Sequence, residues 1–317
     1  MRKEPPYLDS MLWLREQGWS NVKIAEELDT SEASIRRALK KYQREYDYCI
    51  DPLQFKNILG EMEKPVQWDL WNGGNIAITA DWHIPLVDID YVNLFLITAR
   101  KWNCKRLVIA GDFLNGDTYS NYFPKQANAG VKYEVDVAVA VMDKLLDTFD
   151  EVLFLKGNHD YRYVRARDYT VSFVEVMQET FQGLGDKLGR VTFSNLDNCI
   201  VMDGEQKWYV CHPKTYSSIP GTVARKLTSI HECNVITGHS HHCADLPGIN
   251  SKYRAVEIGG FMDMAQTEYL QETTTFPHWT KGFGLLTEEN GFVLFHGQSV
   301  GYHRHRAVDP KAFPVGR

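Results

Sequence analysis

The chain has 317 residues, of which 44% are hydrophobic and 24% charged, and its formal net charge is −6. This length and composition suit one large domain with an appendage, and they exclude disordered and collagen-like classes. We expect no membrane partner, because no apolar run reaches the roughly 18 residues that a membrane-spanning helix needs.

The cysteines are scattered and form no CxxC pair; they stand at positions 49, 104, 199, 211, 233 and 243. In a chain this long, such spacing indicates reduced thiols rather than a disulfide framework. The first residues, MRKEPP, lead into no apolar stretch of the kind found in secretory signals. These features predict a cytoplasmic protein.

The charge is unevenly distributed along the chain. Residues 1–45 hold nine Lys or Arg and eight Asp or Glu, a net of +1, whereas the remainder holds 26 against 33, a net of −7. A nucleic-acid contact is therefore expected to begin at the N-terminal part. An acidic remainder can also hold divalent cations, whose charge changes the local electrostatics.

Residues 1–45 show three helical patterns, over 8–17, over 21–28 and after Ser31. Ser20 and Ser31 are suited to cap the second and third helices, and Asp29 lies in the turn between them. The apolar positions at helical spacing are Leu8, Met11 and Leu12, then Ile24, Ala25 and Leu28, then Ile35, Ala38, Leu39 and Tyr42.

The opposite face of the third pattern is basic. Five bases against the single acid Glu32 give residues 31–44 a net charge of +4; the bases are Arg36, Arg37, Lys40, Lys41 and Arg44. The segment IAEELDTSEASIRRAL resembles the helix-turn-helix of resolvases and bacterial regulators, with Asp29 where such turns often carry glycine. The resemblance implies DNA binding through the third helix, and a homodimer as one assembly. The alternative is a three-helix cap with a solvated basic face.

Residues 46–72 are expected to link this helix-turn-helix domain, 1–45, to a catalytic domain over 73–317. The body alternates short β-rich runs at 75–80, 106–110 and 151–155 with helical spacing at 88–102 and 133–148. After residue 190, short strands follow at 191–194, 198–202, 207–212, 234–237, 255–259, 282–287 and 292–296. The pattern predicts an α/β fold in which a second sheet packs on the first, with helices outside.

Five of these runs end in residues that can bind metals. Ligands bind beyond the carboxyl ends of strands in open α/β sheets, so we expect these ends to converge. Adjacent glycines let the backbone turn sharply or come close to the ligands. The five ends are Asp81-Trp82-His83, Gly111-Asp112-Phe113-Leu114-Asn115, Gly157-Asn158-His159-Asp160, His212 and Gly238-His239-Ser240-His241.

The ordered set DxH, GDxxN, GNHD, H and GHxH, over residues 75–245, resembles the calcineurin-like metallophosphoesterase superfamily. The resemblance implies a double β-sandwich flanked by helices and two divalent ions, with Mn²⁺ favoured over Fe, Zn or Ni. It assigns one ion to Asp81, His83 and His241, the other to Asn158, His212 and His239, and makes Asp112 the bridge. It places His159 at the reacting phosphate as a non-ligand, with Asp160 beside it as an orienting group. Asn115, which ends the second motif, is expected to support the ligands from behind, and the alternative is a plain loop role.

The implied reaction is hydrolysis of a phosphate ester by a hydroxide shared between two metal ions, with His159 protonating the leaving group or stabilising charge. The DNA-binding head favours a nuclease or DNA phosphodiesterase. A phosphomonoesterase, or a phosphodiesterase acting on a nucleotide or another small molecule, is the alternative, and a non-enzymatic DNA-binding regulator is a third. Tyr161, Arg162, Arg165 and Arg167 either contact substrate phosphates or form a solvated helix face.

Overall fold

The computed structural model describes residues 8–17, 19–46, 63–120, 130–263 and 279–297. The chain divides into two compact units, Met1–Glu63 and Lys64–Arg317, which we call the head and the body. None of the helices in the described ranges is both long and apolar enough to cross a membrane.

The described part of the head consists of α1 (Leu8–Glu16), α2 (Asn21–Glu27) and α3 (Glu32–Tyr46). Ser20 and Ser31 begin α2 and α3, since their hydroxyls accept the backbone N–H of Lys23 at 3.3 Å and of Ser34 at 3.2 Å. Asp29 adopts the left-handed φ of 45° that glycine usually takes in such turns. The head core contains Met11, Leu14, Ile24, Ala25 and Ile35; the side chains of Leu8 and Tyr42 lie outside the description.

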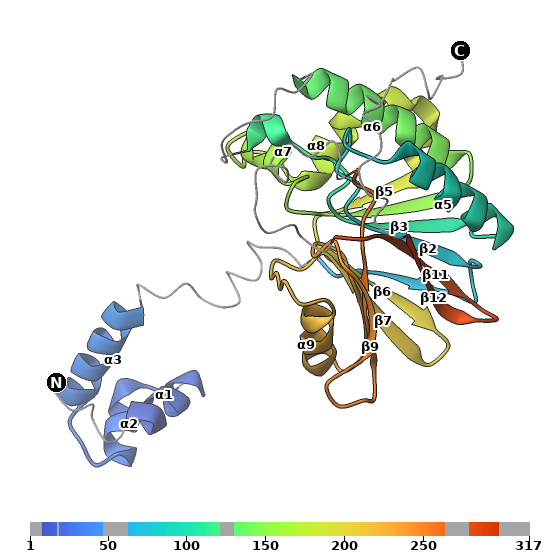
Figure 1. Ribbon diagram of the computed structural model, residues 1–317. Helices are drawn as coiled ribbons and strands as arrows, with labels where there is room; N and C mark the ends of the chain where they lie inside the picture. Colours follow the sequence, from blue (N-terminus) through green and yellow to red (C-terminus); the bar gives the residue numbers. More distant parts are fainter. Residues whose placement is uncertain (1–7, 18, 47–62, 121–129, 264–278, 298–317) are drawn as a thin grey trace. The chain divides into compact units, whose positions relative to one another are not determined.

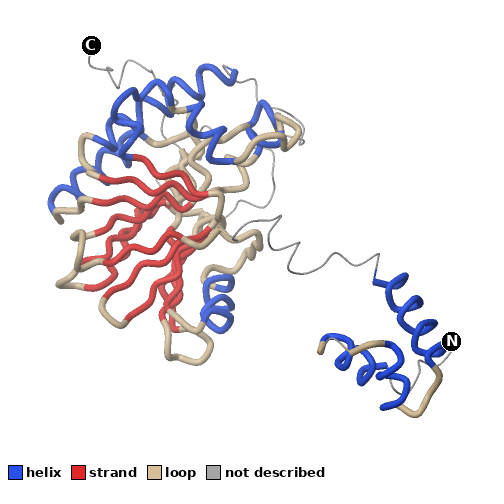
Figure 2. The backbone as a smooth tube through the Cα atoms, turned by 180° about the vertical axis from the view of Figure 1, so that it is seen from behind, coloured by secondary structure: helices blue, strands red, loops and turns tan. Residues whose placement is uncertain are grey.

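Two six-stranded sheets form the centre of the body (Figures 1 and 2). The first has the order β12-β11-β2-β3-β4-β5, in which β2 to β5 are parallel and β11 and β12 are antiparallel additions. Its strands are β2 (Ile76–Thr79), β3 (Arg106–Ala110), β4 (Glu151–Leu155), β5 (Val191–Ser194), β11 (Lys281–Thr287) and β12 (Gly291–Gly297).

The second sheet has the order β1-β6-β7-β8-β10-β9. Its strands are β1 (Val66–Asp69), β6 (Asn198–Asp203), β7 (Gln206–Cys211), β8 (Asn234–Thr237), β9 (Cys243–Pro247) and β10 (Arg254–Ile258). Helices α5 (Ile89–Lys101), α6 (Gly130–Leu146) and α8 (Phe173–Thr180) lie along the outer face of the first sheet, and α9 (Thr222–His231) lies beside the second (Figure 1). The short helix α7 (Arg162–Arg165) and the 3₁₀ segments Asp117–Tyr119 and Gln182–Arg190 lie in connections.

Alternate residues of the first sheet supply two cores. Val108 and Ala110 of β3 pack between the sheets with Val210 and Ile236, whereas Leu107 and Ile109 point to the helices, where they meet Phe95 of α5 and Val141 of α6. Both faces of the central strands are therefore buried, as expected for parallel strands covered on both sides. The predicted mixed α/β fold of two packed sheets flanked by helices is confirmed.

The structure differs from the sequence prediction in the start of the body, in one missed strand and in the sheet to which three strands belong. β1 lies inside the range 46–72 that was assigned to the linker, and it pairs in parallel with β6, so the compact body begins at Lys64. β9 was missed because it is an exposed edge strand that ends at Pro247, a residue that weakens a strand pattern. Finally, β5, β11 and β12 join the first sheet rather than the second.

Candidate metal centre

The seven predicted ligands converge at the carboxyl ends of five strands. Asp81 and His83 follow β2, Asp112 follows β3, and Asn158 follows β4. His212 follows β7, and His239 and His241 follow β8. Three overlapping groups bring one ligand atom from each member within 4.8 Å of the others: Asp81, His83 and His241; Asp112, His212 and His239; and His83, Asp112 and His159.

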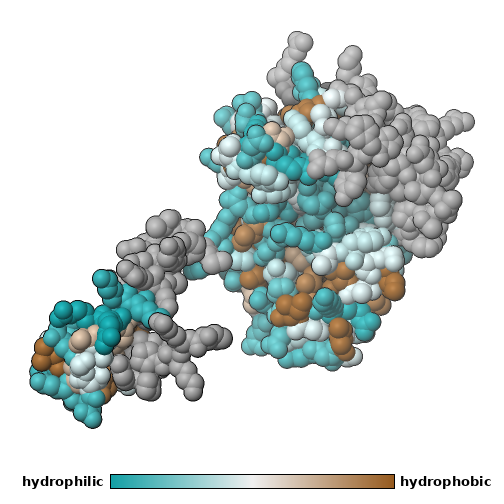
Figure 3. All heavy atoms as spheres, turned by 90° about the vertical axis from the view of Figure 1, so that its left-hand side faces the viewer, coloured by the Kyte–Doolittle hydropathy of each residue, from teal (hydrophilic) through white to brown (hydrophobic). Residues whose placement is uncertain are grey.

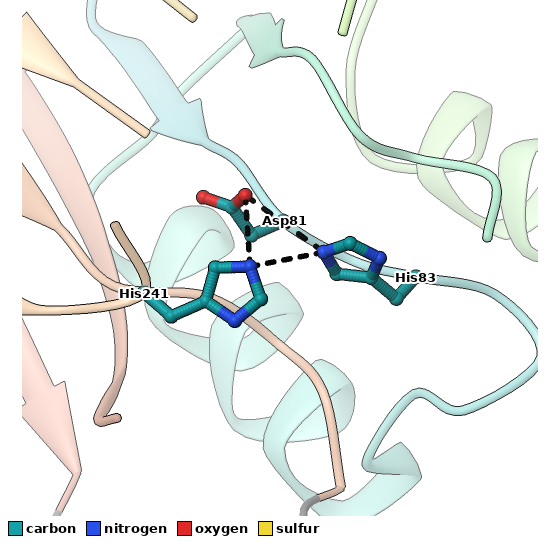
Figure 4. A group of neighbouring side chains, drawn as sticks. All are labelled: Asp81, His83 and His241. Atoms are coloured by element: carbon teal, nitrogen blue, oxygen red, sulfur yellow. Dashed lines mark hydrogen bonds and ion pairs between the residues drawn. The ribbon is translucent and has the colours of Figure 1, made fainter. Parts of the chain in front are cut away.

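The first group joins both sheets in one small space (Figure 4). The Nε2 atom of His241 lies 3.3 Å from Oδ1 of Asp81 and 3.1 Å from Nε2 of His83. The Nε2 atom of His83 lies 3.9 Å from the same carboxylate oxygen. Asp81 and His83 are buried and His241 is partly exposed, so the group opens toward solvent on one side.

The second group is built around Asp112. Its Oδ2 lies 3.2 Å from Nε2 of His212 and 4.0 Å from Nε2 of His83, which belongs to the first group. Asn158, which is exposed, places its Oδ1 3.0 Å from Nε2 of His212. The rings of His212 and His239 are 5.0 Å apart. Asp112 thus stands between the two groups, the position that the resemblance gives to the bridging carboxylate.

The chemistry of these atoms fits cations. Oδ1 of Asp81 is buried without a hydrogen-bond partner among the described residues. Nδ1 of His212 donates to the carbonyl of Ala110 at 2.9 Å, so its Nε2 is the nitrogen that faces the oxygens of Asp112 and Asn158. Without a metal ion, a proton on Nε2 balances the negative charge of Asp112, and a cation bound there would take the place of that proton. Burial lowers the pKa of His212, but the charge of Asp112 outweighs it and raises that pKa to about 10.

The pKa values of the two carboxylates are also shifted toward the charged form. Burial raises the pKa of Asp81 and of Asp112, but the neighbouring imidazoles outweigh it and leave both pKa values below the usual range. The site therefore keeps two buried anions among histidines. Imidazole, carboxylate and amide donors suit Mn²⁺, Fe²⁺, Zn²⁺ or Ni²⁺, and the whole cluster fits a binuclear metal site.

Five of the seven predicted ligands have left-handed backbone conformations. Their φ values are 54° at Asp81, 49° at His83, 52° at Asp112, 75° at His239 and 57° at His241. Such a conformation costs a non-glycine residue roughly 1–3 kcal/mol and persists only where surrounding contacts enforce it. The carbonyl of Asp112 accepts the N–H groups of Trp82 and His83, at 2.8 and 3.0 Å, which ties the β2 and β3 ends together.

Two glycines permit this close approach, as the sequence predicts. A Cβ at Gly157 would overlap the backbone nitrogen and side chain of Asp112. At Gly111 the φ is 78°, and a Cβ would stand 2.7 Å from the ring of His212. Both positions therefore require glycine for lack of space, and Gly111 for its conformation as well.

His159 lies beside both groups with a fixed tautomer. Its Nδ1 is 2.8 Å from the carbonyl oxygen of Asn115, which only accepts, so Nδ1 carries the proton. Its Nε2 is 3.2 Å from Nη2 of Arg162, which only donates, so Nε2 is unprotonated. Burial and the charges of His83 and Arg162 lower the pKa of His159 to about 3 against the opposing effect of Asp112.

Asn115 and Asp160 support the site in ways the sequence did not predict. Asn115 acts through its backbone carbonyl, which any residue would supply. The carboxylate of Asp160 accepts the backbone N–H groups of Asp112, Leu114 and Gly157 at 2.7, 2.8 and 3.1 Å. These contacts fix the loops after β3 and β4, and the orienting of the His159 ring by Asp160 stays a prediction.

Sequence reasoning also missed two neighbours of the site. The ring of Trp279 lies 4.3 Å from that of His241, although Trp279 precedes β11, far along the chain. Glu134 of α6 is buried and accepts the N–H of Gly116 at 2.7 Å and the hydroxyl of Tyr163 at 3.0 Å. A lone tryptophan and a helical glutamate carry no motif, so only the fold connects them with the ligands.

The predicted DNA-contacting residues belong to the head. Arg36, Arg37, Lys40 and Lys41 lie exposed on α3. Arg44 belongs to the same helix, and its side chain lies outside the description.

Comparison with known proteins places residues 74–243, more than half of the chain, in a match to the family described as calcineurin-like phosphoesterase. Similar solved structures include the phosphoesterase Yfce from E. coli, with 13% identity and a TM-score of 0.35, covering 68% of this chain and 89% of that one. Vps29 from Chaetomium thermophilum has 11% identity and a TM-score of 0.38, covering 71% and 95%. A protein serine/threonine phosphatase from Saccharomyces cerevisiae has 10% identity and a TM-score of 0.39, covering 76% and 86%. No curated protein matches the chain.

Proposed function

Because the chain belongs to the calcineurin-like phosphoesterase family and is therefore a metal-dependent phosphoric ester hydrolase, we propose that it is a nuclease that hydrolyses phosphodiester bonds of DNA. In this proposal the head, a helix-turn-helix unit, binds DNA and the metal centre of the body cleaves it. The exposed basic face of α3 is the observation that carries the proposal.

The basic face is a consequence of how the head folds. Ile35 is buried against Ile24 and Ala25, so the opposite side of α3 faces solvent. That side carries Arg36, Arg37, Lys40 and Lys41, and most of the visible described surface of the head is hydrophilic (Figure 3). Phosphate contacts of this kind supply the salt-dependent, sequence-independent part of DNA affinity.

The ion pair within this face does not oppose DNA binding. Nη2 of Arg36 lies 2.5 Å from Oε1 of Glu32, one turn earlier, and both side chains are largely exposed. An exposed pair at this spacing contributes only about 0.3–0.5 kcal/mol, so a DNA phosphate competes with Glu32 for Arg36. A tethered head also raises the local concentration of DNA at an acidic body.

We assign the metal ligands of the body as the resemblance implies. Asp81, His83 and His241 would hold one ion, Asn158, His212 and His239 the other, and Asp112 would be shared; we propose Mn²⁺ for both. When bound, the ions supply charge withdrawal, orientation of the ester and a nucleophile at neutral pH. The protein supplies two buried carboxylates and a neutral His159 with a fixed Nδ1–H.

A phosphomonoesterase, or a phosphodiesterase for small molecules, is the second candidate. The acidic character of residues 46–317, whose net charge is −7, favours it because an acidic surface repels a polyanion. The two candidates make opposite predictions for the head, since only a DNA substrate requires it.

The test compares the full chain with a variant in which Arg36, Arg37, Lys40 and Lys41 are all replaced by alanine. Both proteins, loaded with Mn²⁺, are assayed on single-stranded DNA, duplex DNA and an aryl phosphate. We expect the variant to keep its aryl phosphatase rate and to lose most DNA cleavage at about 0.15 M salt. DNA affinity of the wild type should fall with salt at a slope that the variant reduces by up to about 3.6.

A matched control replaces four exposed residues of the body, Lys101, Lys105, Lys226 and Lys252, by alanine. This variant removes the same charge and should cleave DNA at the wild-type rate. Failure of the wild type to cleave any DNA while it hydrolyses the aryl phosphate would contradict the nuclease and support the second candidate.

A further inference from the structure

Four residues after His159 were left undecided by the sequence, and their side-chain contacts show that one of them differs from the other three. Nη2 of Arg165 donates to the carbonyl of Tyr119 at 2.5 Å, and Arg167 forms an ion pair with Glu179 at 2.8 Å. The ring of Tyr161 lies under Nζ of Lys156, at 5.1 Å from its centroid. Of the four residues that the sequence left undecided, only Arg162 turns to His159.

Arg162 is held at the site by three acceptors of different kinds. Its Nη1 donates to the carbonyl of Asn115 at 3.0 Å and to Oδ1 of Asp117 at 3.3 Å, while Nη2 donates to Nε2 of His159 at 3.2 Å. Only 12% of the side chain is exposed. The planar guanidinium is therefore fixed in one orientation, with its charge directed at the imidazole.

Asn115 joins Arg162 and His159 into one unit. The same carbonyl oxygen accepts Nδ1–H of His159 and Nη1–H of Arg162. His159 consequently has no proton on Nε2, the nitrogen that faces Arg162, so the positive charge on this side of the metal cluster resides on the guanidinium. Of its five N–H groups, contacts with the described residues use three, which leaves donors for another oxygen.

We propose that Arg162 is a catalytic residue that binds a non-bridging oxygen of the substrate phosphate beside His159. A guanidinium suits this task because its fork matches the spacing of phosphate oxygens and it stays charged at every relevant pH. Asn158, the residue before His159, is exposed, so the cluster is open to solvent on the side of this segment. The inference rests on the phosphoesterase chemistry of the family and is independent of whether DNA is the substrate.

The test uses the full chain loaded with Mn²⁺ and the variants Arg162→Ala, Arg162→Lys and Arg167→Ala. Arg167 is the matched control, because it lies on the same segment and pairs with Glu179 at the surface. With bis(p-nitrophenyl) phosphate, Arg162→Ala should lower kcat/KM by about 10²–10³-fold, the usual effect of removing one charge-stabilising donor. Arg167→Ala should stay within about threefold of the wild type.

Two further readouts separate a contact with phosphate from a structural role. Added guanidinium should restore part of the activity of Arg162→Ala and leave Arg167→Ala unchanged. Binding of orthovanadate, measured by calorimetry on the metal-loaded proteins, should weaken at least tenfold in Arg162→Ala and less in Arg162→Lys, which keeps the charge. Thermal melting shows whether Arg162→Ala is folded. If it is not, the vanadate affinity and the rate of Arg162→Lys are compared with those of the wild type instead.

Wild-type vanadate affinity in both Arg162 variants, or an Arg162→Ala rate within threefold of the wild type, would overturn the proposal. The outcome is separable from that of the nuclease proposal. If the chain leaves DNA intact but loses aryl diester hydrolysis on Arg162→Ala, the nuclease proposal fails and the role of Arg162 stands.

Discussion

The carboxylate of Asp160 accepts the backbone N–H of Asp112 at 2.7 Å, and it thereby joins the loop after β4 to the loop after β3. The same Oδ2 accepts the N–H of Gly157, and Oδ1 accepts that of Leu114. A fully buried side chain thus satisfies three backbone donors at the place where the sheet presents Asp112, the proposed bridging ligand. The geometry of Asp112 therefore depends on this residue, although Asp160 belongs to none of the three groups of candidate metal-binding residues.

Replacing Asp160 by asparagine should destabilise the protein and weaken metal binding. The amide has one acceptor oxygen, and its NH₂ group would face a backbone N–H that loses its partner. A buried unsatisfied donor costs roughly 1–3 kcal/mol. Urea unfolding should show a loss of this size, and dialysis against Mn²⁺ followed by metal analysis should show reduced occupancy. The control is Asp136→Asn, which affects an exposed pair with Lys132 and should change stability by less than about 0.5 kcal/mol. Equal stability of the two variants would contradict the role given to Asp160.

Much of the body could be predicted from the sequence because its central strands are buried on both faces. Continuous apolar runs such as 107–110 and 152–155 lie within β3 and β4, since these residues pack alternately on the helices and on the second sheet. Edge strands are not buried on both faces, so their sequences are not restricted to apolar residues. β1 and β9 contain exposed and charged residues and were not predicted. The sheet to which a strand belongs depends on long-range pairing, as in β11 with β2, which no local pattern encodes.

The convergence of the candidate ligands was predictable because metal chemistry restricts the residue types at the strand ends. The supporting contacts were not, because they use backbone atoms or unpatterned side chains. Asn115 contributes a carbonyl oxygen, which leaves no trace in the sequence. The left-handed φ values of Asp81 and His241 likewise follow from the packing of neighbouring loops. Arg162 stood among four undecided residues until the fold showed which of them reaches His159.

Two substitutions distinguish a shared ligand from a ligand of one ion. If Asp112 stands between both groups, Asp112→Ala should bind little metal at either position, whereas His241→Ala should retain about one ion of an expected two. Plasma mass spectrometry after dialysis with Mn²⁺ measures the occupancy. His296→Ala is the control, because His296 lies on β12, outside the cluster, and should keep wild-type occupancy. Equal occupancy in the Asp112 and His241 variants would contradict the bridging assignment.

Gly157→Ala should abolish the arrangement around Asp112. An added Cβ would overlap the backbone nitrogen of Asp112 and would lie 2.8 Å from Oδ2 of Asp160, so the two loops must separate. Overpacking of this kind typically costs about 1–3 kcal/mol. We expect a lower melting temperature and loss of Mn²⁺-dependent hydrolysis. Gly189→Ala provides the control, because its Cβ would meet no atom within 4 Å. A fully active Gly157→Ala protein would show that the loops have room that the structure does not indicate.

The buried carboxyl of Glu134 should make the stability of the metal-free protein depend on pH. Burial raises its pKa to about 7, although the N–H of Gly116 and the hydroxyl of Tyr163 oppose the rise. Between about pH 4.5 and 7 the folded protein keeps this proton while the unfolded chain releases it. The stabilisation is therefore complete at low pH and declines as pH rises, by at most about 1.4 kcal/mol per pH unit. Glu134→Gln, which retains an acceptor oxygen for Gly116, should remove the contribution of Glu134 to the pH dependence of the free energy of unfolding.

Urea unfolding at a series of pH values, in the presence of a chelator, measures this dependence. The control is Glu205→Gln, in the exposed turn between β6 and β7, which should follow the wild type. A difference between wild type and Glu134→Gln that stays constant across this range would mean that Glu134 ionises at its ordinary pKa despite its burial.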